Sequence, residues 1–227
     1  MLNYYENINP MYGAARADLF RYLLIYEYGG VYLDIKSTIV NPLDDVLRPD
    51  DDYLLSKWRN GPGEDYEGWG TYYPKIDGIE SEYQQWHIVA SARHPFLKAV
   101  IEKVRHNIDR YSPFTDGVGK NGVMKLTGPI AYTSAIEPIL AHHKHRLLDI
   151  EDLGFRYSII PSENHNQYGH VKLFKNHYTT LTEPIVKRRQ YSRFEGLLIK
   201  NLHQYGSAYR RLRGRIKQRR WLKTKLA

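Results

Sequence analysis

The amino-acid sequence predicts one α/β domain over residues 1–186, followed by a basic amphipathic helix within residues 187–227. Three observations support this prediction: a helical apolar period that a Gly-Gly pair ends, several short apolar stretches of strand length, and an abrupt change of charge near residue 187. With 227 residues, of which 42% are hydrophobic, the chain is long enough to bury a sizeable core.

The first predicted elements are a helix and the strand that follows it. Residues 11–28 carry apolar side chains at the 3-4 spacing of an amphipathic helix, and Gly29-Gly30 ends it. The next stretch, GGVYLDIK, predicts a buried strand in which Asp34 and Lys36 emerge on one face, because side chains at i and i+2 point the same way. A helix, a glycine break and a strand form half of a βαβ unit, and a charged pair at a strand end indicates a site.

The remaining elements follow from turn signals and apolar periods. The strongest are a helix over Phe96–Ile108 and a second helix that a Thr127-Gly128-Pro129 turn opens, since proline suits a first helical position. A long surface loop is expected over residues 60–80, where Gly, Pro, Tyr and acids concentrate. The others are a short helix near residue 43, a strand in 51–58, a strand or short helix in 83–91, strands in 145–151 and 157–162, and a loop holding His165, His170 and His177.

The charge of the chain is concentrated at its carboxyl end. Residues 187–227 hold 14 of the 33 Lys and Arg and one of the 25 Asp and Glu, a net of +13, so residues 1–186 carry −5. Apolar side chains recur there at 4-3-4 spacing from Leu198 to Ile216, with bases on the other faces. Basic amphipathic helices of this kind lie on anionic membrane surfaces or pack against a partner, and an anionic membrane is the partner expected for the tail.

Composition excludes several classes of protein. The chain has no cysteine, which rules out disulfides, zinc–thiolate sites and cysteine nucleophiles. No apolar run approaches the roughly 20 residues that cross a bilayer, and the first residues lack the pattern of a signal peptide. We therefore expect a cytoplasmic protein that is peripheral on the inner membrane face.

One block of sequence resembles a known enzyme family. The block AARADLFRYLLIYEYGGVYLDIKSTIVNPLDDVL is similar to the signature region of the DXD-containing glycosyltransferases of family thirty-two, and HPFL at 94–97 and TGPIAYT at 127–133 are similar to downstream segments. The resemblance implies a GT-A-like, Rossmann-like catalytic domain over residues 1–186. It also implies a UDP- or GDP-sugar donor, transfer with retention, and a glycan or lipid-linked acceptor in surface polysaccharide or glycolipid synthesis.

The resemblance assigns roles to individual residues. Asp18 and Arg21 would hold hydroxyls of the donor sugar, and Asp34 would be the first acid of the DXD motif, with Tyr32 lining the donor pocket. Such roles suit the chemistry, because a diphosphate leaving group and an oxocarbenium-like centre both need charge stabilisation. Further donor contacts are expected from Gly30, Lys36, Thr127, Gly128 and His177.

Two features depart from the family. Lys36 stands where the second DXD acid coordinates Mg²⁺ or Mn²⁺, and lysine cannot ligate these ions. Lys36 is therefore either a substitute cation or a partner of Asp34. Asp34 together with Asp44 or a later acid could still hold a metal ion. The second departure is at the amino end. Only 17 residues precede Asp18, so the strand-helix-strand unit that usually builds the base pocket is expected to be missing.

Two other functions stay open at the level of sequence. LDIK fits the Asp-x-Lys half of a metal-dependent nuclease site, with Asp18 as the upstream acid, although the −5 charge of residues 1–186 disfavours a nucleic-acid partner. The other is a sugar-nucleotide-binding protein whose catalysis has lapsed. It predicts donor binding without turnover.

Overall fold

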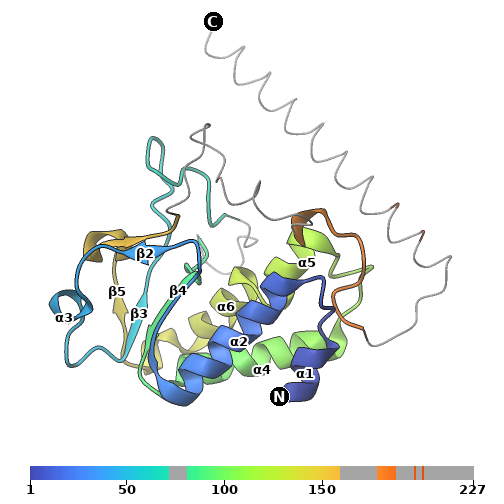
Figure 1. Cartoon of the computed structure of the whole chain (residues 1–227), viewed down its shortest axis with the longest axis horizontal. Helices are drawn as coiled ribbons and strands as arrows, with labels where there is room; N and C mark the ends of the chain where they lie inside the picture. The colour runs from blue at the N-terminus through green and yellow to red at the C-terminus, as the bar shows by residue number, and fades with distance from the viewer. Residues whose placement is uncertain (72–80, 159–177, 188–196, 198–200, 202–227) are drawn as a thin grey trace, which may run out of the picture.

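The computed structural model describes residues 1–71, 81–158 and 178–187, together with Leu197 and Asn201. A mixed α/β fold results, in which the helices other than the short one at Leu43–Val46 gather on one side of a small sheet (Figure 1). The predicted basic helix and the predicted loop with His165, His170 and His177 lie outside the described residues. None of the described helices is long and apolar enough to cross a membrane.

The main sheet has four strands in the order β1-β4-β3-β5: β1 (Gly30–Leu33), β4 (His87–Ala90), β3 (Tyr53–Leu55) and β5 (Arg146–Leu147). The β1–β4 and β4–β3 pairs are antiparallel, whereas β3–β5 is parallel. The half βαβ unit expected at Gly30 is therefore wrong in one respect. The strand after the helix pairs with an antiparallel neighbour more than 50 residues later in the chain. A second sheet pairs β2 (Thr38–Ile39) with β6 (Phe155–Arg156).

Three of the helices follow the sequence signals closely. Helix α2 (Gly13–Tyr28) ends at Gly29, α4 (Pro95–Arg110) begins after His94, and α6 (Pro129–Ile136) begins at the expected proline. The His94 side chain caps α4 by accepting a hydrogen bond from the Phe96 backbone N–H at 3.2 Å. The other helices are α1 (Leu2–Asn7), α3 (Leu43–Val46) and α5 (Gly119–Leu126), with 3₁₀ turns η1 (Glu137–His142), η2 (Ile150–Leu153) and η3 (Tyr178–Thr180).

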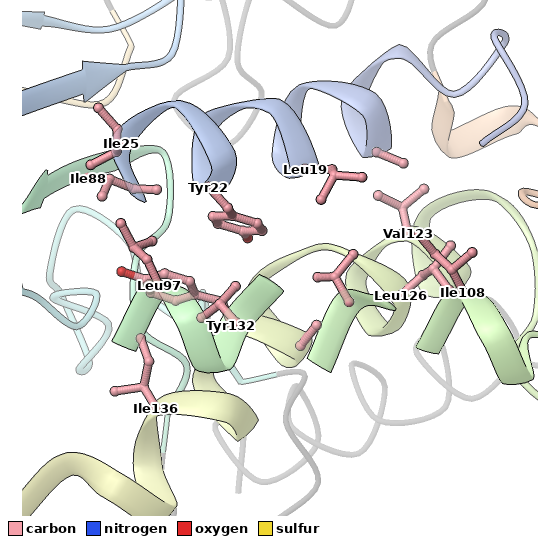
Figure 2. Packing of buried hydrophobic residues seen from close by; sticks show 14 of the residues in the cluster. Leu19, Tyr22, Ile25, Ile88, Leu97, Ile108, Val123, Leu126, Tyr132 and Ile136 are labelled. Atoms are coloured by element: carbon pink, nitrogen blue, oxygen red, sulfur yellow. The ribbon is translucent and has the colours of Figure 1, made fainter. Parts of the chain in front are cut away.

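Alternation along β3 and β4 divides the interior into two cores. Ile88 and Ala90 of β4 face the helices, whereas Val89 between them faces the opposite side, as the two-residue period of a strand requires. The helix-side core holds α2 against α4, α5 and α6, and Figure 2 shows Leu19 and Tyr22 of α2 above Leu97 and Tyr132. The second core is built from Leu54, Trp86, Val89, Ile150, Phe155 and Tyr157.

Gly29 has a conformation that only glycine adopts readily. Its φ of 68° and ψ of −168° let the chain leave α2 and enter β1 at once. A Cβ atom there would lie 2.7 Å from the backbone nitrogen of Ala92. The predicted glycine break is thus confirmed, and it fixes the direction in which β1 leaves the helix.

Candidate active site

A charged pair occupies the buried face of α2. Asp18 and Arg21 have side chains that are 5% and 6% exposed, and their carboxylate and guanidinium lie 3.2 Å apart. They share this face with apolar residues at helical spacing, Ala15, Leu19, Tyr22 and Ile25. A pair on the surface of a helix would be worth only a few tenths of a kcal/mol, but a buried pair needs partners for every charge.

Asp18 receives three polar contacts. Thr127 Oγ1 donates to Asp18 Oδ2 at 2.8 Å, and Gln85 Nε2 donates to Asp18 Oδ1 at 3.3 Å, in addition to the ion pair with Arg21. The Tyr22 hydroxyl holds the same residues in place, because it donates to the Thr127 carbonyl at 2.9 Å and contacts the Gln85 side-chain oxygen. Burial raises the pKa of Asp18, and the charge of Arg21 opposes that rise.

Arg21 connects Asp18 to the end of β1. Its Nη1 lies 2.9 Å from Asp34 Oδ1 and donates to the Gln85 carbonyl at 2.9 Å. The guanidinium lies over the Tyr32 ring, 4.7 Å from the ring centre. Burial lowers the pKa of Arg21, but the charges of Asp34 and Asp18 outweigh burial and raise it above its ordinary value. The guanidinium is therefore held between two carboxylates.

Asp34 lies in a turn after β1, which corrects one expectation. Strand β1 ends at Leu33, and the Ser37 backbone N–H and hydroxyl both donate to the Asp34 carbonyl, at 2.8 and 2.6 Å. Asp34 and Lys36 are thus not neighbours on one strand face. The turn nevertheless brings Lys36 Nζ to 3.9 Å from Asp34 Oδ2 and turns Ile35 into solvent.

Lys36 is anchored from the other side by a residue far away in sequence. Its Nζ donates to the Tyr157 hydroxyl at 2.6 Å. Burial lowers the pKa of Lys36, and the charge of Asp34 only partly compensates. Asp34 and Lys36 have side chains that are 18% and 16% exposed, so they form the solvent-facing part of a cluster whose base is Asp18 and Arg21.

The structure brings most of the predicted site residues together, with exceptions. Thr127 contacts Asp18, and Gly128 follows it as the residue before α6. Gly30 does not join them. It is the first residue of β1, whereas Asp34 follows the last, and the rise per residue of a strand places the two backbones about 13 Å apart. His177 lies outside the described residues.

Sequence reasoning missed two members of the cluster, Gln85 and Tyr157. Gln85 precedes β4, which pairs with β1, so its polar character just before an apolar stretch was a usable signal. Tyr157 was expected in a strand over residues 157–162, of which 159–162 lie outside the described residues; it directly follows the strand Phe155–Arg156. With 20 tyrosines in the chain, nothing local marked this one.

The same geometry tests whether a metal fits. Among the described residues no group of three or more His, Asp or Glu could hold a metal ion. Asp34 is the one acid of the DXD-like motif, and its Oδ1 already accepts from Arg21 and from the Tyr32 hydroxyl at 3.3 Å. Mg²⁺ and Mn²⁺ need several oxygen ligands, so the residues described here do not fit such an ion.

Comparison with known proteins gives the cluster a context. Residues 1–54 match the family described as the glycosyltransferase sugar-binding region containing DXD motif. This segment is the part of the chain that resembles DXD-containing glycosyltransferases. It contains α2 and β1, and with them Asp18, Arg21, Tyr32, Asp34 and Lys36. The predicted family resemblance is confirmed.

Two curated fungal relatives carry the name initiation-specific alpha-1,6-mannosyltransferase. The protein from Candida albicans is 29% identical over 136 residues, covering 53% of this chain and 34% of the relative. The protein from Schizosaccharomyces pombe is 28% identical over 127 residues, covering 53% and 30%. The chain therefore spans about a third of the length of these relatives. Among solved structures, the PaToxG glycosyltransferase overlaps 56% of this chain and 36% of its own, at 20% identity and a TM-score of 0.38.

Proposed function

We propose that this chain carries the donor site of a retaining glycosyltransferase with a GT-A-like domain, which transfers a sugar from a UDP- or GDP-sugar to a glycan or lipid-linked acceptor. The observation that supports it is the Asp18–Arg21–Asp34 cluster, which lies within the segment that matches the family. The names of the fungal relatives make mannose the first sugar to test.

The residues of the cluster differ in burial, and this difference suggests different roles for them. Asp34 reaches solvent and keeps Oδ2 free of Arg21, so it is the group that would bind a sugar hydroxyl and stabilise positive charge at the anomeric centre. Asp18 and Arg21 are almost fully buried. They act as positioning residues, because Arg21 fixes the Asp34 carboxylate and Asp18 fixes Arg21. Thr127 and Gln85 hold Asp18 in turn.

The acceptor and the location rest on the sequence of the tail. The +13 net charge of residues 187–227 would bring the enzyme to an anionic membrane, where lipid-linked acceptors of surface polysaccharide synthesis reside. In this proposal the protein acts on the cytoplasmic face of the inner membrane.

The direct test is donor hydrolysis. The full chain is incubated with a panel of UDP- and GDP-sugars that begins with GDP-mannose, and nucleotide release is followed. One donor should turn over, and Asp34→Asn should abolish release while circular dichroism shows an intact fold. Asp45→Asn is the matched control, because Asp45 is exposed in the first turn of α3, and it should leave release unchanged. Turnover that survives in Asp34→Asn contradicts the site, and donor binding without turnover favours the lapsed enzyme.

A further inference from the structure

Both oxygens of the Asp34 carboxylate face positive charge. Arg21 and the Tyr32 hydroxyl occupy Oδ1, and the Lys36 ammonium faces Oδ2. A divalent cation at Oδ2 would sit beside the ammonium of Lys36. Like charges this close repel each other inside a protein, and a divalent ion is repelled more strongly than a monovalent one. The site therefore disfavours the metal that the second DXD acid holds in the family.

The four charges of the cluster already balance. Asp18 and Asp34 contribute two negative charges, and Arg21 and Lys36 contribute two positive ones. A diphosphate arriving at this cluster needs positive charge that is accessible. Arg21 cannot supply it, since its side chain is 6% exposed and lies between the two carboxylates. Lys36 is the cation of the cluster that reaches solvent.

The Lys36 ammonium also has more hydrogen-bond donors than its contacts with Tyr157 and Asp34 use. An ammonium carries three N–H donors. One is used by the Tyr157 hydroxyl at 2.6 Å, and the 3.9 Å separation from Asp34 Oδ2 is longer than a hydrogen bond. Among the described residues, the contacts of Lys36 therefore leave at least one N–H donor for an anion.

Tyr157 fixes the position of that ammonium. Its ring packs in an aromatic cluster, with ring centres 5.2 to 6.3 Å from those of Trp58, Tyr66, Trp69 and Trp86. A side chain held by four aromatic neighbours moves little, so its hydroxyl holds Lys36 in one place. Holding a cation before the ligand arrives lowers the cost of ordering it on binding.

We propose that Lys36, positioned by Tyr157, takes the place of the divalent cation and binds the diphosphate of the donor directly. This inference rests on the proposed function. When the bond between the anomeric carbon and the phosphate oxygen breaks, its electron pair stays on the diphosphate. The acceptor oxygen forms the new bond to the anomeric carbon, and its proton passes to the departing phosphate. Lys36 stabilises the negative charge that develops there without changing its own protonation.

The test measures binding of UDP and GDP to the full chain by calorimetry, in EDTA and in Mn²⁺. Binding of one nucleotide should agree within about twofold between the two conditions. Lys36→Met should weaken it about 10- to 100-fold, as expected for loss of a charged hydrogen bond. Lys98→Met, an exposed lysine on α4, should leave binding unchanged. Lys36→Asp should bind only in Mn²⁺.

Tyr157 is tested by a double-mutant cycle. Tyr157→Phe keeps the ring and should weaken nucleotide binding severalfold, but it should have no further effect when Lys36 is already Met. A purely structural role of Tyr157 would weaken binding equally in both backgrounds.

The outcomes separate this inference from the proposed function. Wild-type binding that EDTA abolishes and Mn²⁺ restores, or unchanged binding in Lys36→Met, overturns the role of Lys36 while the glycosyltransferase stands. Absence of binding of either nucleotide in both conditions overturns the two together.

Discussion

Replacing Arg21 by methionine should cost about 3–5 kcal/mol of the free energy of unfolding, the range for removing one partner of a buried ion pair. Methionine keeps most of the side-chain length and removes the charge. Asp18, 5% exposed, would then keep only the hydrogen bonds from Thr127 and Gln85. Asp34 is less affected, because it is more exposed and retains Lys36. The penalty therefore falls mainly on the buried charge of Asp18.

The assay is urea unfolding of the full chain at pH 7.5 and pH 5. Burial already raises the pKa of Asp18, and loss of Arg21 should raise it further. A carboxyl group whose pKa is raised in the folded state stabilises the fold when protonated, and this contribution is lost as pH rises. The free energy of unfolding that Arg21→Met loses relative to the wild type should therefore be smaller at pH 5 than at pH 7.5.

Two further variants decide whether the reasoning holds. Adding Asp18→Asn to Arg21→Met removes the unpaired charge, so the double variant should be more stable than the single one at pH 7.5. Arg93→Met removes an ion pair with Glu27 between two exposed side chains, and it should cost less than about 1 kcal/mol. A loss below about 1 kcal/mol in Arg21→Met, or a double variant no more stable than the single one, would refute the buried network.

Two further predictions concern the fold. Burial lowers the pKa of His87 to about 3, so this histidine stays neutral in the fold while the unfolded chain takes up a proton. The free energy of unfolding should therefore fall by about 2 kcal/mol between pH 6.5 and 5. In urea titrations, His87→Leu should flatten that pH dependence. Gly29→Ala should destabilise the protein by about 1–3 kcal/mol, because φ is positive and the new Cβ meets the Ala92 backbone, whereas thermal unfolding of Gly13→Ala, with open space at Cβ, should show no loss.

The elements that sequence predicted well are those whose causes are local. The apolar period of α2, the glycine that ends it and the proline that opens α6 all act within a few residues, and each lies where expected. The buried face of α2 could be predicted too, and Asp18 falls on it because it shares the spacing of Ala15 and Tyr22. Of all features of the site, the burial of Asp18 is the one that the sequence pattern indicates best.

The errors arise where distant residues decide the structure. Strand β1 was expected to continue through Lys36, but its register with β4 ends at Leu33, opposite His87, and the chain turns at Asp34. The direction of that pairing depends on a crossover that no local pattern encodes. Tyr157, which receives the Lys36 hydrogen bond, is 121 residues away. Its role depends on the aromatic cluster, and the sequence shows only that aromatics are frequent.

The two charges that face solvent are held by different cores. Asp34 is fixed through Arg21 to α2, which packs in the helix-side core, whereas Lys36 is fixed through Tyr157 to the second core. The separation between the carboxylate and the ammonium therefore depends on how the two cores are joined, and β4 joins them by facing both with alternate residues. A substitution that loosens the aromatic cluster should displace Lys36 and spare Asp34. The position of the carboxylate and the position of the cation can thus change independently, although only one residue separates them in the sequence.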